Sequence, residues 1–240
     1  MGKLRITLLL VSLLLFPLTL NYMSPVLSLQ GAFEGIASGS LLLFILLFLS
    51  STLLGRIWCG WVCPGGALQD LASGLNNSKP AKAADHAKYL IWAIWLGLIV
   101  FFFARNGGIR RIDVLYMTEN VISIDEPFKF IIYYSVVALL LSVAVLLGRR
   151  GACHGICWMA PFMACGMSAG WLVKAPSLHI RYKKEACTAC GLCKKVCPMS
   201  LDPAASAMSR KPELECINCG ECVRACRGGA LSFHFGVRKQ

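Results

Sequence analysis

The sequence has 240 residues, of which 57% are hydrophobic and only 15% are charged. Because soluble domains carry about 25% charged residues, this composition argues against an ordinary soluble domain and favours a membrane protein. The net charge of +12 would suit nucleic acid, but no basic and aromatic recognition motif accompanies it. We therefore expect no nucleic acid partner, and instead anionic membrane lipid or an acidic protein.

Four apolar segments are long enough to cross a bilayer core, which needs about 17–25 helical residues. They cover about residues 4–22, 40–58, 88–104 and 129–147. The first could be taken for a signal peptide, but it lacks a clear small-x-small cleavage site and continues apolar to about Leu29, so we expect an uncleaved helix. The sequence thus predicts a transmembrane domain over residues 1–178 that contains a four-helix bundle.

The basic residues that flank these segments predict their orientation. If the amino terminus is inside, the inner flanks carry nine basic residues and the outer loops carry four. The inner ones are Lys3, Arg5, Arg56, Lys79, Lys82, Lys88, Arg149, Arg150 and Lys174, and the outer ones are Arg105, Arg110, Arg111 and Lys129. This asymmetry predicts a multi-pass protein of the inner (cytoplasmic) membrane with both termini in the cytoplasm.

Residues 156–173 form a further uncharged segment of 18 positions that could be a fifth span. Pro161 and a run of small residues weaken that reading. Gly166 and Gly170 form a small-xxx-small face, which favours close packing against another helix. We expect a re-entrant or interfacial helix here.

An Arg-x2-Cys-x3-Cys pattern begins at Arg56 and recurs 94 residues later at Arg150, each time after a pair of apolar segments. The chain therefore reads as two repeated helix pairs, which brings all four cysteines to the inner face. A shared metal centre, redox-active or metal-handling dithiols, and inert thiols remain open for this set. Either arginine could lower a thiol pKa or neutralise a cluster, or it could simply anchor the inner interface. The four cysteines are Cys59, Cys63, Cys153 and Cys157.

The region after about His179 has no apolar run and contains two identical Cys-x2-Cys-x2-Cys-x3-Cys runs, 29 residues apart. The 13 cysteines are an odd number, so complete disulfide pairing within one chain is impossible. Zinc is the alternative metal, but two identical four-cysteine runs favour iron–sulfur clusters. We predict a domain over residues 179–240 that binds two [4Fe–4S] clusters.

Residues 183–235 resemble the bacterial two-cluster ferredoxin module in spacing and in pseudo-repeat. The resemblance implies a small α+β domain in which the fourth cysteine of each run ligates the other cluster. Arg227 departs from the pattern, because it follows the last cysteine where proline is expected. One cluster would then take Cys187, Cys190, Cys193 and Cys226, and the other Cys216, Cys219, Cys222 and Cys197.

Nearly the whole chain resembles the NapH/NosR group of membrane iron–sulfur proteins, through the cysteine pairs and the carboxy-terminal module. Pro64 completes the Cys-x3-Cys-Pro motif of that group, whereas Trp158 replaces the second proline. The resemblance implies an oxidoreductase subunit, similar to a quinol dehydrogenase, that acts within a complex and passes electrons between the quinol pool and a partner redox protein or reductase. With no flavin-bearing domain expected before the helices, the shorter NapH-like arrangement fits better than the NosR-like one.

Two other roles stay open at this point. One is a maturation or metal-reducing factor that supplies electrons to metallo-enzyme assembly through the cysteine pairs. The other is an anchoring subunit of a larger catalytic complex.

Several kinds of chemistry are disfavoured by what the sequence lacks. It has no Cys-x2-Cys-His motif, and all four histidines lie outside the four apolar segments, so we expect no heme. His154, inside the second cysteine motif, could be a ligand, a proton carrier or an interfacial polar residue. No carboxylate pair, nucleophilic triad or nucleotide-binding glycine loop stands out, so we assign no catalytic residue.

Overall fold

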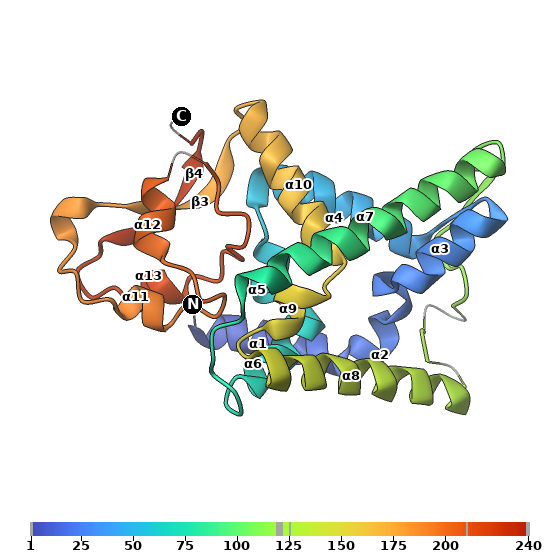
Figure 1. Cartoon of the computed structure of the whole chain (residues 1–240), viewed down its shortest axis with the longest axis horizontal. Helices are drawn as coiled ribbons and strands as arrows, with labels where there is room; N and C mark the ends of the chain where they lie inside the picture. The colour runs from blue at the N-terminus through green and yellow to red at the C-terminus, as the bar shows by residue number, and fades with distance from the viewer. Residues whose placement is uncertain (1, 119–121, 125, 210, 239–240) are drawn as a thin grey trace.

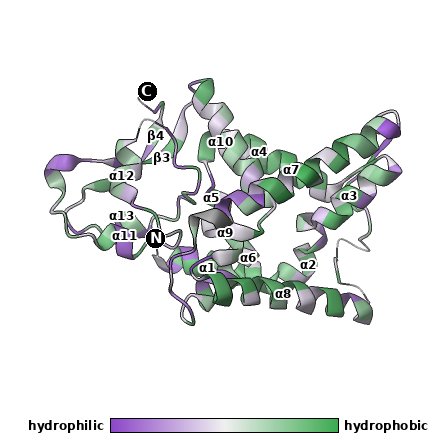
Figure 2. Cartoon of the chain, in the orientation of Figure 1, coloured by the Kyte–Doolittle hydropathy of each residue, from purple (hydrophilic) through white to green (hydrophobic). Residues whose placement is uncertain are grey.

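The structure is a computed structural model that describes residues 2–118, 122–124, 126–209 and 211–238, without the side chains of residues 82–84. Its amino-terminal three-quarters is largely a group of helices of unequal length (Figure 1). The carboxy-terminal domain, coloured orange to red, forms one end of the molecule, and the amino terminus lies beside it (Figure 1). Strongly hydrophobic colouring covers much of α4, α7 and α8 (Figure 2).

Two described helices are long and apolar enough to cross a membrane. They are α7 (Lys82–Arg105) and α8 (Pro127–Leu147). Only 11% of the apolar window in α7 and 6% of that in α8 are buried inside the molecule. Such exposed apolar surface is unfavourable in water and favours a lipid environment, because lipid tails satisfy it.

The first predicted helix, at 4–22, is divided into three short elements. These are α1 (Gly2–Leu14), α2 (Phe16–Thr19) and the 3₁₀ helix η1 (Asn21–Met23). The break lies at Leu15, two residues before Pro17, which has no amide hydrogen and whose ring clashes with the carbonyl four residues earlier. At 1.5 Å per residue, the 13 residues of α1 reach about 20 Å, which is short of a bilayer core.

The second predicted helix, at 40–58, is α4 (Gly39–Leu54), which ends at Gly55 with a positive φ of 62°. It has 16 residues, so it also falls short of the usual span. A four-helix transmembrane bundle therefore stays a prediction. Between these segments lie α3 (Pro25–Glu34) and the strand β1 (Ile36–Ser38), which pairs in parallel with β2 (Arg111–Asp113).

The uncharged segment at 156–173 forms α10 (Met159–Leu172), which packs closely along α4. A Cβ atom at Gly166 would lie 2.3 Å from the carbonyl oxygen of Phe48, and one at Gly170 would lie 2.6 Å from that of Thr52. The two glycines therefore let the helix backbones approach each other, as the small-xxx-small pattern predicts. Its 14 residues are too few for a usual span.

Short helices carry the two membrane cysteine motifs. They are α5 (Ile57–Trp61) and α6 (Pro64–Ala72) for the first motif, and α9 (Gly151–Gly155) for the second.

The carboxy-terminal domain has the α+β character expected of a ferredoxin-like module. Its strands pair antiparallel, from Ser177 opposite Gly236 to Tyr182 opposite Leu231, and so join the two ends of the domain. Ile180 and Leu231 form its small apolar core with Cys222. The elements are β3 (Ser177–Tyr182), η2 (Lys184–Ala186), α11 (Leu192–Lys195), α12 (Pro203–Met208), α13 (Glu221–Ala225) and β4 (Leu231–Gly236).

Candidate iron–sulfur centres

One cavity of the molecule is lined by four of the eight ferredoxin-type cysteines. Burial, together with the nearby thiols of the other three, raises the pKa of the Cys222 thiol to about 12. A buried thiol surrounded by other thiols stays protonated at neutral pH. An iron–sulfur cluster, in contrast, binds its cysteines as thiolates. The cavity therefore fits one [4Fe–4S] cluster, and its cysteines are Cys197, Cys216, Cys219 and Cys222.

The other four ferredoxin-type cysteines lie farther out in the domain. Cys187 and Cys190 are exposed, and the Ala189 amide donates to Cys187 Sγ at 3.4 Å. Burial raises the pKa of Cys193, and the neighbouring thiol of Cys226 adds to this effect. The fourth cysteine of the second run thus lies beside the first run, which is the exchange that the ferredoxin resemblance implies.

The backbone of the two runs repeats as their sequence does. Ala189 and Asn218 stand at equivalent positions and have φ values of 54° and 47°. Gly191 and Gly220 follow two residues later with φ values of 70° and 78°, and each begins a short helix. Only glycine adopts this left-handed conformation at little cost, so these loops hold cysteines in a turn that most residues disfavour.

The two membrane cysteine motifs meet in space. Burial raises the pKa of Cys63 well above its ordinary value, and the other three thiols of the set raise it further. Burial and the charges of two of the others together raise the pKa of Cys157 to about 12. The structure therefore brings together the predicted set Cys59, Cys63, Cys153 and Cys157, none of which is in a disulfide.

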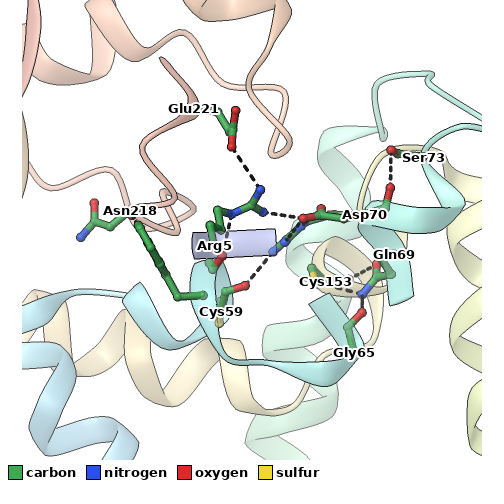
Figure 3. Close-up of polar contacts among 12 residues, drawn as sticks. Arg5, Cys59, Gly65, Gln69, Asp70, Ser73, Cys153, Asn218 and Glu221 are labelled. Atoms are coloured by element: carbon green, nitrogen blue, oxygen red, sulfur yellow. Dashed lines mark hydrogen bonds and ion pairs between the residues drawn. The ribbon is translucent and has the colours of Figure 1, made fainter. Parts of the chain in front are cut away.

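Neighbouring side chains fix two members of this set. Gln69 donates from Nε2 to Cys153 Sγ at 3.1 Å, and its Oε1 accepts from the Cys153 amide at 3.1 Å (Figure 3). Cys59 Sγ lies 3.5 Å from Met163 Sδ on α10. Gln69 was not identified from the sequence, because its role depends on α6 folding back toward α9.

The repeated arginines are buried rather than exposed interfacial anchors. Arg56 is 0% exposed and donates from Nη1 to Glu215 Oε2 at 2.8 Å and to the Leu214 carbonyl at 2.9 Å. Burial alone would lower the pKa of Arg56, but the neighbouring Cys59 thiol and Glu215 carboxylate raise it overall. Arg56 therefore stays protonated near Cys59 and Cys157.

Arg150 forms the matching contacts of the second motif. It is 1% exposed and makes two bonds to the Asp70 carboxylate, at 2.7 Å and 2.8 Å. Its Nη1 donates to the Cys59 carbonyl at 2.8 Å, so the second motif binds the backbone of the first. Asp70 also pairs with Arg5 of α1, which reaches Glu221 as well (Figure 3). Burial would raise the pKa of Asp70, but Arg150 and Arg5 hold it below its ordinary value.

The first membrane motif touches the second ferredoxin-type run directly. A Cβ atom at Gly60 would lie 2.3 Å from the Ile217 carbonyl oxygen and 3.2 Å from Cys219 Cα. Trp61 Nε1 donates to the Asn218 carbonyl at 3.0 Å. The cavity for one predicted cluster is therefore adjacent to the four membrane-domain thiols.

A polar cluster that the sequence did not reveal lies at the same junction. Ligand atoms of Asp85, His154 and Glu215 all lie within 4.8 Å of one another, the only such group in the described part of the chain. His154 Nδ1 is 2.6 Å from Asp85 Oδ1, which makes it a buried, bonded residue. Lys88 Nζ lies 2.6 Å from Glu215 and 3.2 Å from Asp85, so an ammonium group already occupies the position a metal ion would need.

Comparison with known proteins agrees with these sites. A family model described as a 4Fe-4S binding domain matches residues 37–82, which include Cys59 and Cys63. A second, described as a 4Fe-4S dicluster domain, matches residues 179–227, which include all eight ferredoxin-type cysteines.

Three curated relatives cover most of the chain. The putative electron transport protein YccM of Escherichia coli is 25% identical over 82% of this chain. The ferredoxin-type protein NapH of Haemophilus influenzae is 25% identical over 79%, and the regulatory protein NosR of Pseudomonas aeruginosa is 28% identical over 75%. The two 4Fe-4S domains and these relatives support a NapH/NosR-type iron–sulfur protein.

The chain spans 56% of the length of YccM, 66% of NapH and 26% of NosR. No solved structure matches it significantly. Its two 4Fe-4S domains and its ferredoxin-type and electron transport relatives support a role in electron transfer.

Proposed function

We propose that this protein is a membrane-bound electron-transfer subunit that passes electrons between the quinol pool and a partner redox protein. The observation that carries the proposal is the direct packing of Gly60, in the first membrane motif, against Ile217 and Cys219 in the ferredoxin-type domain. Two [4Fe–4S] clusters, when bound, supply one-electron transfer and so accept the two electrons of a quinol separately. The quinol itself is inferred from the NapH/NosR resemblance.

The unequal exposure of the cysteines supports an order for the two sites. Cys197 and Cys222 are each 9% exposed and belong to the site beside the membrane motif. Cys187 and Cys190 are exposed and belong to the outer site. We therefore assign the inner site to exchange with the membrane domain and the outer site to exchange with the partner, on the cytoplasmic side of an inner membrane.

We further propose that the four membrane-domain cysteines hold an additional polynuclear iron–sulfur centre. Thiolates around one tetrahedral ion lie about 3.8 Å apart, because a zinc–sulfur bond is about 2.3 Å. In the residues that the structure describes, no three cysteine sulfurs lie within 4.8 Å of one another, in this set or in the ferredoxin-type sets. This spacing does not match one tetrahedral ion, and the 4Fe-4S binding model over residues 37–82 includes Cys59 and Cys63, so we assign the set to a cluster.

Arg56 gives independent support for an anionic group at this place. Its Nε and Nη2 atoms are buried and have no hydrogen-bond partner in the described part of the chain. Buried donors without a hydrogen-bond partner lower the stability of the folded state, and the sulfides and thiolates of a cluster would accept hydrogen bonds from them. Cys59 and Cys157 are the thiols whose charge acts on this guanidinium.

Iron and acid-labile sulfide counting on the anaerobically purified full chain tests the additional centre. We expect about twelve irons per chain for three [4Fe–4S] clusters, and about eight after Cys59→Ser or Cys153→Ser. Cys165→Ser is the matched control, because Cys165 belongs to neither motif. If the Cys59 and Cys153 variants keep the iron content of the unaltered protein, the additional centre is refuted.

Anaerobic EPR in proteoliposomes tests the electron-transfer role. We expect ubiquinol or menaquinol to produce reduced [4Fe–4S] signals. If neither quinol reduces clusters that dithionite reduces, while the protein reduces a metal ion such as Cu(II), the alternative role in metallo-enzyme maturation replaces this proposal.

A further inference from the structure

A cleft separate from the cysteine sites lies between α1, α6, the segment after α8 and the edge of the carboxy-terminal domain. Its charged lining is predominantly basic, with five cations against two carboxylates. They are Arg5, Arg149, Arg150, Lys195 and Arg224 against Asp70 and Glu221.

The two carboxylates of the cleft are each shared by two cations. Asp70 pairs with Arg5 and Arg150, and Glu221 pairs with Arg5 and Arg224. The two carboxylates therefore balance part of the charge of these three arginines. No carboxylate of the cleft is left to pair with the other two cations, Arg149 and Lys195.

Among the residues that the structure describes, Arg149 is held by neutral groups alone. Its side chain donates to Asn77 Oδ1, to the Lys195 carbonyl at 2.9 Å and to the Cys197 carbonyl at 3.3 Å. The exposed Lys195 side chain makes no ion pair within the described ranges. Two cations thus face the cleft without a carboxylate partner, and backbone carbonyls fix one of them in position. Such an arrangement attracts an anion from outside the chain.

The position of the cleft identifies the kind of anion. Arg149 lies two residues after Leu147, where the membrane-length helix α8 ends. Ile6, Leu10 and Leu71 line the same cleft and are 55%, 48% and 60% exposed. An apolar wall beside unpaired cations at the end of a membrane helix matches an amphiphile with an anionic head.

We propose that this cleft binds an anionic phospholipid, with its phosphate at Arg149 and Lys195 and its acyl chains along Ile6, Leu10 and Leu71. A free phosphate ion would use the cations but not the apolar wall. The bound lipid would join α1, the end of α8 and the carboxy-terminal domain, and it would stabilise their packing by mass action. This proposal does not depend on the quinol reaction.

The test compares purified full-length protein in nanodiscs of phosphatidylcholine with and without phosphatidylglycerol, using native mass spectrometry for bound lipid and thermal unfolding for stability. We expect selective retention of phosphatidylglycerol and a higher Tm in its presence. Lys195→Gln should weaken phosphatidylglycerol binding by about fivefold and the Arg149→Gln/Lys195→Gln variant by about 30-fold. Inorganic phosphate should give no comparable rise in Tm.

Lys194→Gln is the matched control, because Lys194 is exposed, lies outside the cleft and faces Asp202 at 3.7 Å. It should bind phosphatidylglycerol like the unaltered protein. Lys195 is exposed at the surface, so its variant tests the proposal even if the Arg149 variant fails to fold. Equal retention of both lipids, equal effects of Lys194→Gln and Lys195→Gln, or equal protection by inorganic phosphate would each overturn the proposal.

Discussion

At the scale of single residues, buried ion pairs join the two cysteine motifs to each other and to the domain beyond. Arg150 and Arg5 converge on Asp70, and Arg56 and Lys88 converge on Glu215. Replacing a whole buried ion pair by apolar residues changes the stability of a protein little. Removing one partner lowers the stability strongly, because it leaves an uncompensated buried charge. Replacing either carboxylate, Asp70 or Glu215, should therefore lower the stability of the folded protein most.

Asp70→Asn should destabilise the protein by about 3–5 kcal/mol, because it leaves the buried Arg150 and Arg5 without their shared carboxylate. The measurement is thermal or denaturant unfolding in detergent. Asp113→Asn is the control, because Asp113 pairs with Arg111, whose side chain is 67% exposed, and exposed pairs contribute at most about 1 kcal/mol. Equal losses in the two variants would contradict the role given to Asp70.

The same carboxylate predicts a pH dependence of stability. The pKa of Asp70 is lowered in the folded protein from its ordinary value of 3.8, so the folded state binds fewer protons than the unfolded state near that pH. The stabilisation is present above about pH 3.8 and is lost as the pH falls through the lower folded value. Unfolding free energies measured from pH 6 downward should fall less steeply for Asp70→Asn, and parallel curves would contradict this.

At the scale of elements, the packing of α10 on α4 depends on glycine. A Cβ atom at Gly166 would lie 2.0 Å from Ser51 Oγ and 2.3 Å from the Phe48 carbonyl, so Gly166→Ala forces the helices apart. We expect a loss of about 1–3 kcal/mol and a lower Tm. Gly97→Ala in α7 is the control, because nothing lies within 4 Å of its added Cβ and alanine favours helix. An unchanged Tm in Gly166→Ala would refute the close contact.

The sequence predicted some elements well because their signals are local. Cysteine spacing in a repeated run is local, so it predicts a ferredoxin-type 4Fe-4S domain, while the assignment of each cysteine to a cluster stays a prediction. Apolar length alone did not predict where the first two helices end. The first segment is interrupted just before Pro17, and the second helix ends at Gly55 and not at residue 58. The partners Gln69, Asp70 and Glu215 could not be found from the sequence, because each meets a residue at least 80 positions away.

At the scale of the whole molecule, the amino-terminal helix α1 lies against the carboxy-terminal domain. Arg5 of α1 pairs with Glu221 of the carboxy-terminal domain, which agrees with the expectation that both ends share one side of the membrane. That this side is the cytoplasm remains a prediction from the basic flanks. A carboxy-terminal green fluorescent protein fusion should fluoresce and an alkaline phosphatase fusion should be inactive, and the reverse pattern would contradict the orientation.

The junction between the membrane motif and the ferredoxin-type domain should control electron transfer between them. Gly60→Ala places a Cβ atom 2.3 Å from the Ile217 carbonyl oxygen, so it pushes the two parts away from each other. We expect slower quinol-dependent reduction of the inner cluster at unchanged iron content, measured by freeze-quench EPR. Gly65→Ala is the control, because its nearest neighbour would lie at an ordinary 3.6 Å. Equal rates in both variants would argue against this route.

The central proposal is that electrons pass between quinol and a partner through the inner site and the outer site. The most direct test is quinol-dependent reduction of a water-soluble one-electron acceptor by the protein in quinol-containing proteoliposomes, compared with Cys190→Ser at the exposed outer site. We predict that the unaltered protein reduces the acceptor, and that Cys190→Ser does not, although quinol still reduces its inner cluster. Acceptor reduction at the same rate in Cys190→Ser, or none by the unaltered protein, would contradict the claim.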